Sequence, residues 1–237
     1  MNPKHQELHE LLETVDVLRL LAQRGRQEVR GFSWYMVVWG LYAALNLLAE
    51  LLLNLSLWIP LLFVAFFFST LPVAGVLSSF GIWLAVALLS YATYALSHQW
   101  VLTLAVVVLG ATLGYILAYR IGIQRQRYRP LPLKVALAPR IGWAWGMVMA
   151  GMSIVFWNLI QWVPSHHIGA VSLILWGYAL GVGLFLSGLM HPGFFWLGLA
   201  ALFGIPIATA ISPEAGSWAY VLIALAMAVF GGYLYRR

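Results

Sequence analysis

The stretch GFFWLGLAALFG at Gly193–Gly204 and the stretch FGIWLAVALLS at Phe80–Ser90 share a pattern. In both, a small residue precedes a tryptophan, and leucine, alanine and other apolar residues follow it. Both lie in apolar runs that approach the roughly 20 residues needed to cross a bilayer as a helix. The recurrence of one pattern in the two halves of the chain predicts a duplicated membrane unit.

The composition indicates that the bilayer is the solvent of this chain. Hydrophobic residues make up 63% of the 237 residues, charged residues make up 8%, and the mean hydropathy is +0.89. A soluble domain is about 45–50% apolar and about 25% charged. We therefore expect an all-α polytopic membrane protein rather than two soluble domains. The absence of cysteine excludes disulfides, thiolate metal sites and a cysteine nucleophile.

The positive charge is confined to three parts of the chain. None of the 13 Lys and Arg residues falls in 31–119 or 141–235. They are Lys4, Arg19, Arg24, Arg26 and Arg30; Arg120, Arg125, Arg127, Arg129, Lys134 and Arg140; and Arg236 and Arg237. Short basic loops stay on the cytoplasmic side of a membrane. This positive-inside pattern predicts a bacterial-type inner (plasma) membrane protein with both termini cytoplasmic, in contact with the lipid bilayer and with no nucleic-acid partner.

Placing the three basic groups on one side requires an even number of crossings between them. Each intervening stretch has about 90 residues, which accommodates four crossings of ~20 residues. We expect about eight transmembrane helices, near 32–54, 58–78, 81–97, 100–119, 141–162, 168–189, 193–211 and 217–235. Six or seven spans with one re-entrant segment remain an alternative, because the boundary near 78–81 has turn residues but no charge.

Tryptophans recur at similar places in the two predicted halves. Trp83 and Trp196 open the third helix of each half, and Trp100 and Trp218 open the fourth. An even number of spans in each half makes the repeats parallel in orientation. The predicted domains are a cytoplasmic amphipathic helix at 1–30, a first four-helix repeat at 31–119, a basic cytoplasmic loop at 120–140 and a second four-helix repeat at 141–237.

The segment before the first apolar run has a different pattern from the spans. Within residues 3–30, apolar residues recur at alternating spacings of three and four, which predicts an amphipathic helix. The residues of this stripe that we expect to be buried against protein are Leu8, Leu11, Val15 and Leu18. The protein could be the chain's own bundle, a partner or a second copy in a homo-oligomer. The acidic first half of the segment argues against lipid, because helices that lie on membranes carry basic polar faces.

Few polar residues fall inside the predicted spans. Asn46, Glu50 and Asn54 follow one another at spacings of four, and Asn158 and Gln161 fall in the corresponding part of the fifth span. One interpretation is a polar pocket near the outer leaflet, in which Glu50 takes a proton or a cation. The other is a solvated stripe, because an ionised group costs much less near the interface than at the bilayer centre.

No catalytic motif accompanies these residues. The sequence has no nucleophile elbow, P-loop or dinucleotide-binding turn, and its histidines do not face one another within spans as haem ligands would. We therefore expect no enzymatic activity, no cofactor and no metal. The leading hypothesis is a non-catalytic integral membrane subunit, scaffold or regulatory protein that docks a partner through its N-terminal helix and bundle. The alternative is a small-solute or lipid transporter with a polar site near Glu50.

Overall fold

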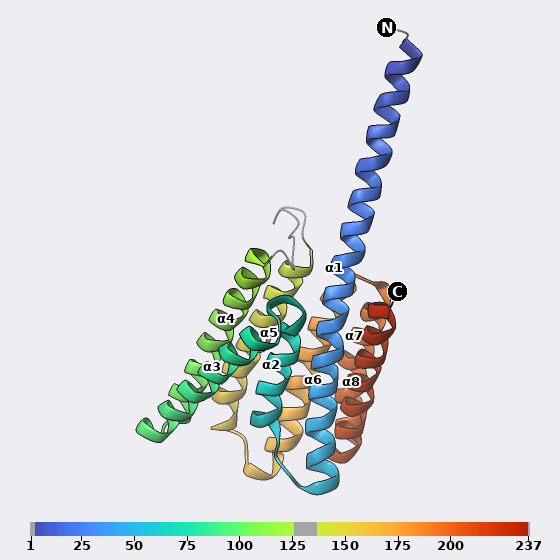
Figure 1. The fold of residues 1–237 in the computed structure, drawn as a ribbon. Coiled ribbons are helices and arrows are strands. Elements are labelled where there is room, and N and C mark those ends of the chain that lie inside the picture. The colour runs from blue at the N-terminus through green and yellow to red at the C-terminus, as the bar shows by residue number, and fades with distance from the viewer. Residues whose placement is uncertain (1–2, 126–136, 237) are drawn as a thin grey trace.

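The computed structural model describes residues 3–125 and 137–236, except for the side chains of 3–14, 16–18, 20, 21, 24, 100, 101 and 139. The described residues form eight α-helices and a short 3₁₀ turn at Ser165–His167 (Figure 1). The helices are α1 (Pro3–Leu53), α2 (Trp58–Ala74), α3 (Val76–Ser97), α4 (Trp100–Gln124), α5 (Ala138–Ile160), α6 (Ile168–Ser187), α7 (Pro192–Ile211) and α8 (Pro213–Arg236). The all-helical prediction is confirmed.

Seven of the described helices contain a segment long and apolar enough to cross a membrane, which indicates a multi-pass membrane protein. The helix in the predicted second span, α2, has 17 residues. At 1.5 Å per residue it is about 26 Å long, shorter than a hydrocarbon core of about 30 Å. The predicted number of eight spans therefore corresponds to seven full-length helices and one short apolar helix.

The predicted boundary between the second and third spans, near 78–81, is wrong. The chain breaks at Gly75, where φ is 81°, a conformation that glycine adopts at little cost. The Gly75 N–H donates to the Leu71 carbonyl at 3.0 Å, and the Gly75 carbonyl accepts from the Ser79 N–H at 3.0 Å. One glycine thus ends α2 and begins α3, with Pro72 weakening the last turn of α2.

The predicted amphipathic helix and the first span form one continuous helix of 51 residues. The expected boundary at residues 30 and 31 is not a helix break. Between Pro3 and Pro60 the chain has no proline. Glycine within a helix costs only about 1 kcal/mol, so Gly25 and Gly31 do not interrupt it.

Small residues bring α1 close to α8. A side-chain carbon on Gly40 would lie 2.6 Å from the carbonyl oxygen of Ala224, and one on Gly231 would lie 2.8 Å from the carbonyl oxygen of Ser33. In a membrane, helices associate through such close packing, because lipid supplies no hydrophobic driving force between them. This contact joins the first helix of the chain to the last (Figure 1).

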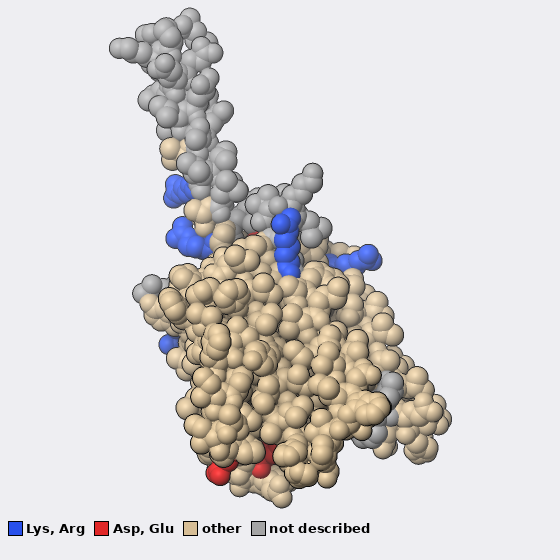
Figure 2. Space-filling view, turned by 180° about the vertical axis from the view of Figure 1, so that it is seen from behind, with Lys and Arg blue, Asp and Glu red and all other residues tan. Residues whose placement is uncertain are grey.

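Described arginines of the three basic parts of the chain lie at one end of the bundle, which we call the basic end. The guanidinium carbon of Arg30 lies 4.9 Å from the ring centroid of Tyr235, and Arg125 Nη1 donates to the Ala74 carbonyl at 3.4 Å. Figure 2 shows the described arginines gathered toward this end and acidic side chains at the opposite end, whereas Glu28 lies near the basic end. Glu50, in the last turn of α1, and Glu214, in the first turn of α8, lie at that opposite end.

The third helix of each predicted half runs in the same direction. Both α3 and α7 begin at the basic end, as parallel repeats require. The surroundings of the matched tryptophans differ, however, because Trp83 is 3% exposed and Trp196 is 67% exposed. The superposition of these two residues stays a prediction, and the side chain of Trp100 lies outside those described.

Candidate functional site

The predicted polar stripe of α1 lies where the helix ends. Asn46 is half-buried and Glu50 is exposed, whereas Asn54 lies beyond the helix. Asn54 has a φ of 52°, and its N–H donates to the Glu50 carbonyl at 3.1 Å. Asparagine tolerates this left-handed conformation and often occupies the position after a helix C-terminus. Asn54 therefore has a local role in ending α1.

The second predicted polar group lies at the end of α5. Asn158 is exposed and donates through Nδ2 to the carbonyl of Ile154, one turn earlier in its own helix, at 2.8 Å. Gln161 follows the last residue of α5 and is exposed. Among the hydrogen bonds of the described residues, none joins Asn158 or Gln161 to Glu50. A polar pocket formed by the five residues therefore stays a prediction.

Sequence reasoning missed a buried aromatic cluster between α1, α2, α3 and α4. The rings of Phe66 and Trp83 stack with centroids 4.5 Å apart, and the ring of Tyr115 lies edge-on to both. The Trp83 indole donates to Thr70 at 2.8 Å, and the hydroxyls of Ser69 and Tyr115 lie 2.8 Å apart. These bonds satisfy buried polar groups and hold the α3–α4 hairpin against α2. The signal available in sequence was the hydroxyl pair Ser69–Thr70 within an otherwise apolar helix.

The N-terminal part of α1 extends beyond the basic end of the bundle (Figure 1). Of the predicted stripe, the side chain of Val15 is described and is 57% exposed, while those of Leu8, Leu11 and Leu18 lie outside the described side chains. One turn further along, Val15 is followed by exposed Arg19. The described part of the stripe is therefore not covered by the chain's own bundle.

The projecting stripe continues the face of α1 that packs on α8. Eighteen residues make five turns of an α-helix, so residues 18 apart share a face. Val15 is 18 residues before Ser33, and Ala22 is 18 residues before Gly40. Ser33 and Gly40 are buried in the bundle, whereas Val15 and Ala22 are exposed. One face of α1 is thus covered by α8 within the bundle and uncovered beyond it.

The direction of the projecting helix is fixed where it leaves the bundle. The Glu28 carboxylate oxygen Oε2 accepts from the Leu137 N–H at 3.3 Å, which ties α1 to the start of α5. Trp34 donates to the Phe68 carbonyl at 2.9 Å, and its ring lies 5.4 Å from that of Tyr235. Contacts to α2, α5 and α8 therefore surround the last turns before the projection.

Comparison with protein-family models, with curated proteins and with solved structures found no match. The function must therefore be inferred from the residues of this chain. Two surfaces stand out, namely the polar residues at the end opposite the arginines and the exposed stripe of α1 at the basic end. At the second, the described side chains of Val15 and Ala22 are apolar and exposed on one face of the helix.

Proposed function

We propose that this chain is a non-catalytic subunit, scaffold or regulator of the inner membrane that docks a protein partner on the projecting part of α1. The observation that carries the proposal is the continuity of one helix face. That face is covered by α8 as far as Ser33 and is exposed at Val15, beyond the end of α8. An apolar face that continues past its covering helix favours a second helix as its occupant.

The energy available at the stripe supports a protein partner. Burying one leucine or valine side chain is worth about 1.5–3 kcal/mol relative to leaving it exposed. The stripe Leu8, Leu11, Val15 and Leu18 offers four such side chains on one helix. Because α1 is already helical through this region, a partner would not have to fold it.

The basic end is the side on which we propose that the partner binds. Arg19, Arg26, Arg30, Arg120, Arg125, Arg140 and Arg236 are all exposed at this end. Translocating such clusters across a membrane is unfavourable, which supports a cytoplasmic location for the projecting helix and for both termini. The partner is then a cytoplasmic protein, the cytoplasmic part of another membrane protein, or a second copy of this chain.

The transporter alternative has less support. It depended on a polar site near Glu50, but Asn54 ends a helix and Asn158 bonds to its own helix. Glu50 itself is exposed at the end of α1, where an ionised carboxylate is inexpensive. We therefore propose that the function lies at the basic end of the molecule.

Site-specific cross-linking in native membranes tests the docking proposal. The chain has no cysteine, so Val15→Cys can carry a single cysteine-reactive photo-cross-linker. We expect one discrete adduct at Val15→Cys and none at Gln27→Cys, an exposed position about 120° around the same helix. Adding Leu11→Glu and Leu18→Glu should abolish the adduct and leave thermal unfolding of the bundle unchanged.

Other outcomes separate the remaining explanations. An adduct of twice the chain mass identifies a homo-oligomer as the partner. Loss of thermal stability in the double glutamate variant, with no adduct in any sample, would show that the stripe covers the chain's own bundle. Protection of Val15→Cys by liposomes alone would indicate a helix that lies on lipid.

A further inference from the structure

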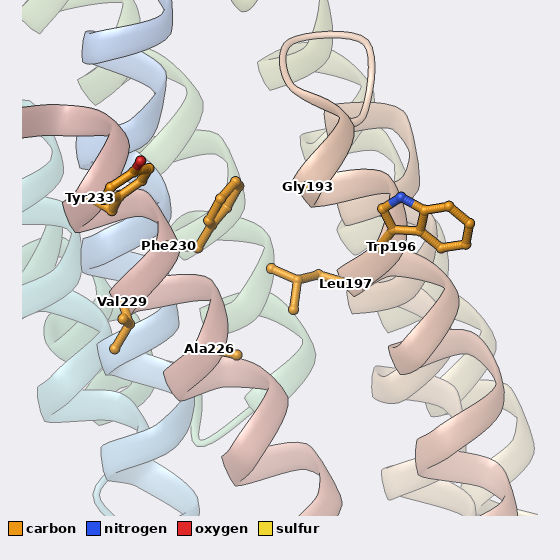
Figure 3. A pocket seen from close by; sticks show the side chains of 7 residues that line it. All are labelled: Gly193, Trp196, Leu197, Ala226, Val229, Phe230 and Tyr233. Carbon is orange, nitrogen blue, oxygen red and sulfur yellow. The ribbon is translucent and has the colours of Figure 1, made fainter. Parts of the chain in front are cut away.

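An apolar groove runs between α7 and α8 on the outer surface of the bundle (Figure 3). Its volume is about 590 Å³. The groove is open to the outside, since Trp196 and Val229 on its two sides are largely exposed. The residues that line it are Gly193, Trp196 and Leu197 of α7 and Ala226, Val229, Phe230 and Tyr233 of α8.

The floor of the groove depends on a glycine. Any side-chain carbon on Gly193 would collide with the ring of Phe230, so the ring lies directly against the start of α7. Phe230 also packs edge-on against Phe194, with ring centroids 5.1 Å apart. Phe194 is fully buried in the core, which fixes the position of the floor.

The apolar lining of the groove and its length along α8 suit part of one acyl chain. Its lining on α8 extends from Ala226 to Tyr233, seven residues or about 10.5 Å along the helix. This length lies within one leaflet of a hydrocarbon core about 30 Å thick. Since the described lining is apolar apart from the Tyr233 hydroxyl and the Trp196 indole nitrogen, a hydrocarbon chain fits it.

The rim of the groove favours an anion. Arg236 is exposed and follows Val229 by seven residues and Tyr233 by three, so the three residues share one face of α8. His191 Nδ1 accepts from the Gly193 N–H at 3.1 Å, which leaves the proton of the neutral ring on Nε2 as a donor. The His191 ring lies 5.1 Å from that of Phe230, at the N-terminus of α7, where the helix dipole is positive.

We propose that this groove is a binding site for one anionic glycerophospholipid of the leaflet at the basic end. One acyl chain occupies the groove over Phe230, and the phosphate accepts hydrogen bonds from the Arg236 guanidinium and His191 Nε2–H. A zwitterionic headgroup binds less well, because its own cation lies beside Arg236. This site goes beyond the proposed docking function and does not depend on it.

Native mass spectrometry of the full-length protein in detergent tests the proposal. The probes are dioleoylphosphatidylglycerol and dioleoylphosphatidylcholine, which share their acyl chains. We expect one phosphatidylglycerol molecule to bind about tenfold more tightly than phosphatidylcholine, because the choline cation of the latter lies beside the Arg236 guanidinium. Arg236→Gln should remove this preference, whereas Arg120→Gln, which removes an exposed arginine of α4 at the same end, should keep it.

A second pair of variants tests whether the groove binds the acyl chain. Ala226→Leu fills the groove and should lower the affinity for both lipids, whereas Ala105→Leu, at an exposed alanine on α4, should not. Equal binding of the two lipids by the unaltered protein, or equal effects of Arg236→Gln and Arg120→Gln, would overturn the proposal. Displacement of the lipid by inorganic phosphate would also overturn it, since it would show an anion site that does not bind the acyl chain.

Discussion

The indole N–H of Trp83 donates a hydrogen bond of 2.8 Å to the hydroxyl of Thr70, and both residues are buried. This bond joins α3 to α2. In the second half of the chain, Trp145 donates at 2.9 Å to the hydroxyl of buried Ser187, which joins α5 to α6. Each half thus contains a tryptophan whose indole N–H donates to a hydroxyl on a neighbouring helix.

Removing the acceptor of Trp83 should destabilise the bundle. Thr70→Val keeps the shape of the side chain but leaves the buried indole N–H without a partner, at a cost of about 1–3 kcal/mol. Thr70→Ser should retain most of the stability, because it keeps the hydroxyl. Thr112→Val is the matched control, since the exposed Thr112 hydroxyl bonds only to the carbonyl of Val108 in its own helix. Denaturant unfolding in micelles measures the difference, and equal losses for Thr70→Val and Thr112→Val would contradict the role of the bond.

The contact between α1 and α8 should not tolerate a methyl group at Gly40. The added carbon would lie 2.6 Å from the Ala224 carbonyl oxygen, so the helices must separate. We expect Gly40→Ala to cost about 1–3 kcal/mol, the range for overpacking. Gly31→Ala, on the same helix with no neighbouring atom within 4 Å, should be neutral or stabilising by up to about 1 kcal/mol. A stability of Gly40→Ala equal to that of Gly31→Ala in thermal unfolding would show that the helices are not packed in this way.

Much of the helical architecture could be predicted because hydrophobicity and charge determine it directly. The predicted spans near 168–189 and 193–211 differ from α6 and α7 by no more than two residues at either end. Positions that depend on one dihedral angle were harder to predict. The sequence predicts the boundary between α2 and α3 near 78–81, but those residues are helical and the positive φ is at Gly75. Hydropathy does not distinguish this glycine from the others in the chain.

The candidate site was predicted less completely than the fold. The spacing of Leu8, Leu11, Val15 and Leu18 identified a stripe, but it could not show that the helix continues into the first span. The relation between Val15 and Ser33 depends on that continuity. The groove over Phe230 was also not predictable, because it forms between segments that pair only in three dimensions.

The orientation of the protein in the membrane can be tested at its two ends. Ser165, in the turn before α6, lies at the end opposite the arginines, and Gln124, the last residue of α4, lies at the basic end. If the basic end is cytoplasmic, Ser165→Cys should react with a membrane-impermeant maleimide in intact cells. Gln124→Cys should react only after the membrane is permeabilised. The cysteine-free wild type gives no background. Labelling of Ser165→Cys only from inside would reverse the proposed topology.

The last prediction concerns the angle between the stripe and the bundle. Because Val15 repeats the face of Ser33, a partner on the stripe should also meet the end of α8. Alanines inserted between Gly25 and Arg26 rotate the stripe about the helix axis by about 100° each and lengthen the helix by about 1.5 Å each. One insertion changes the angle by about 100°, two by about 200° and four by a net of about 40°.

The cross-linking yield at Val15→Cys should therefore depend on the rotation of the stripe about the helix axis and not on the length of the helix. We expect the adduct to be weakest with two inserted alanines, stronger with one and strongest with four, although four lengthen the helix most. Thermal unfolding should stay constant through the series, since the insertions lie outside the contact of Glu28 with Leu137. A yield that falls steadily with the number of alanines, or one that does not change, would show that the partner contacts the stripe alone and that the bundle takes no part in docking.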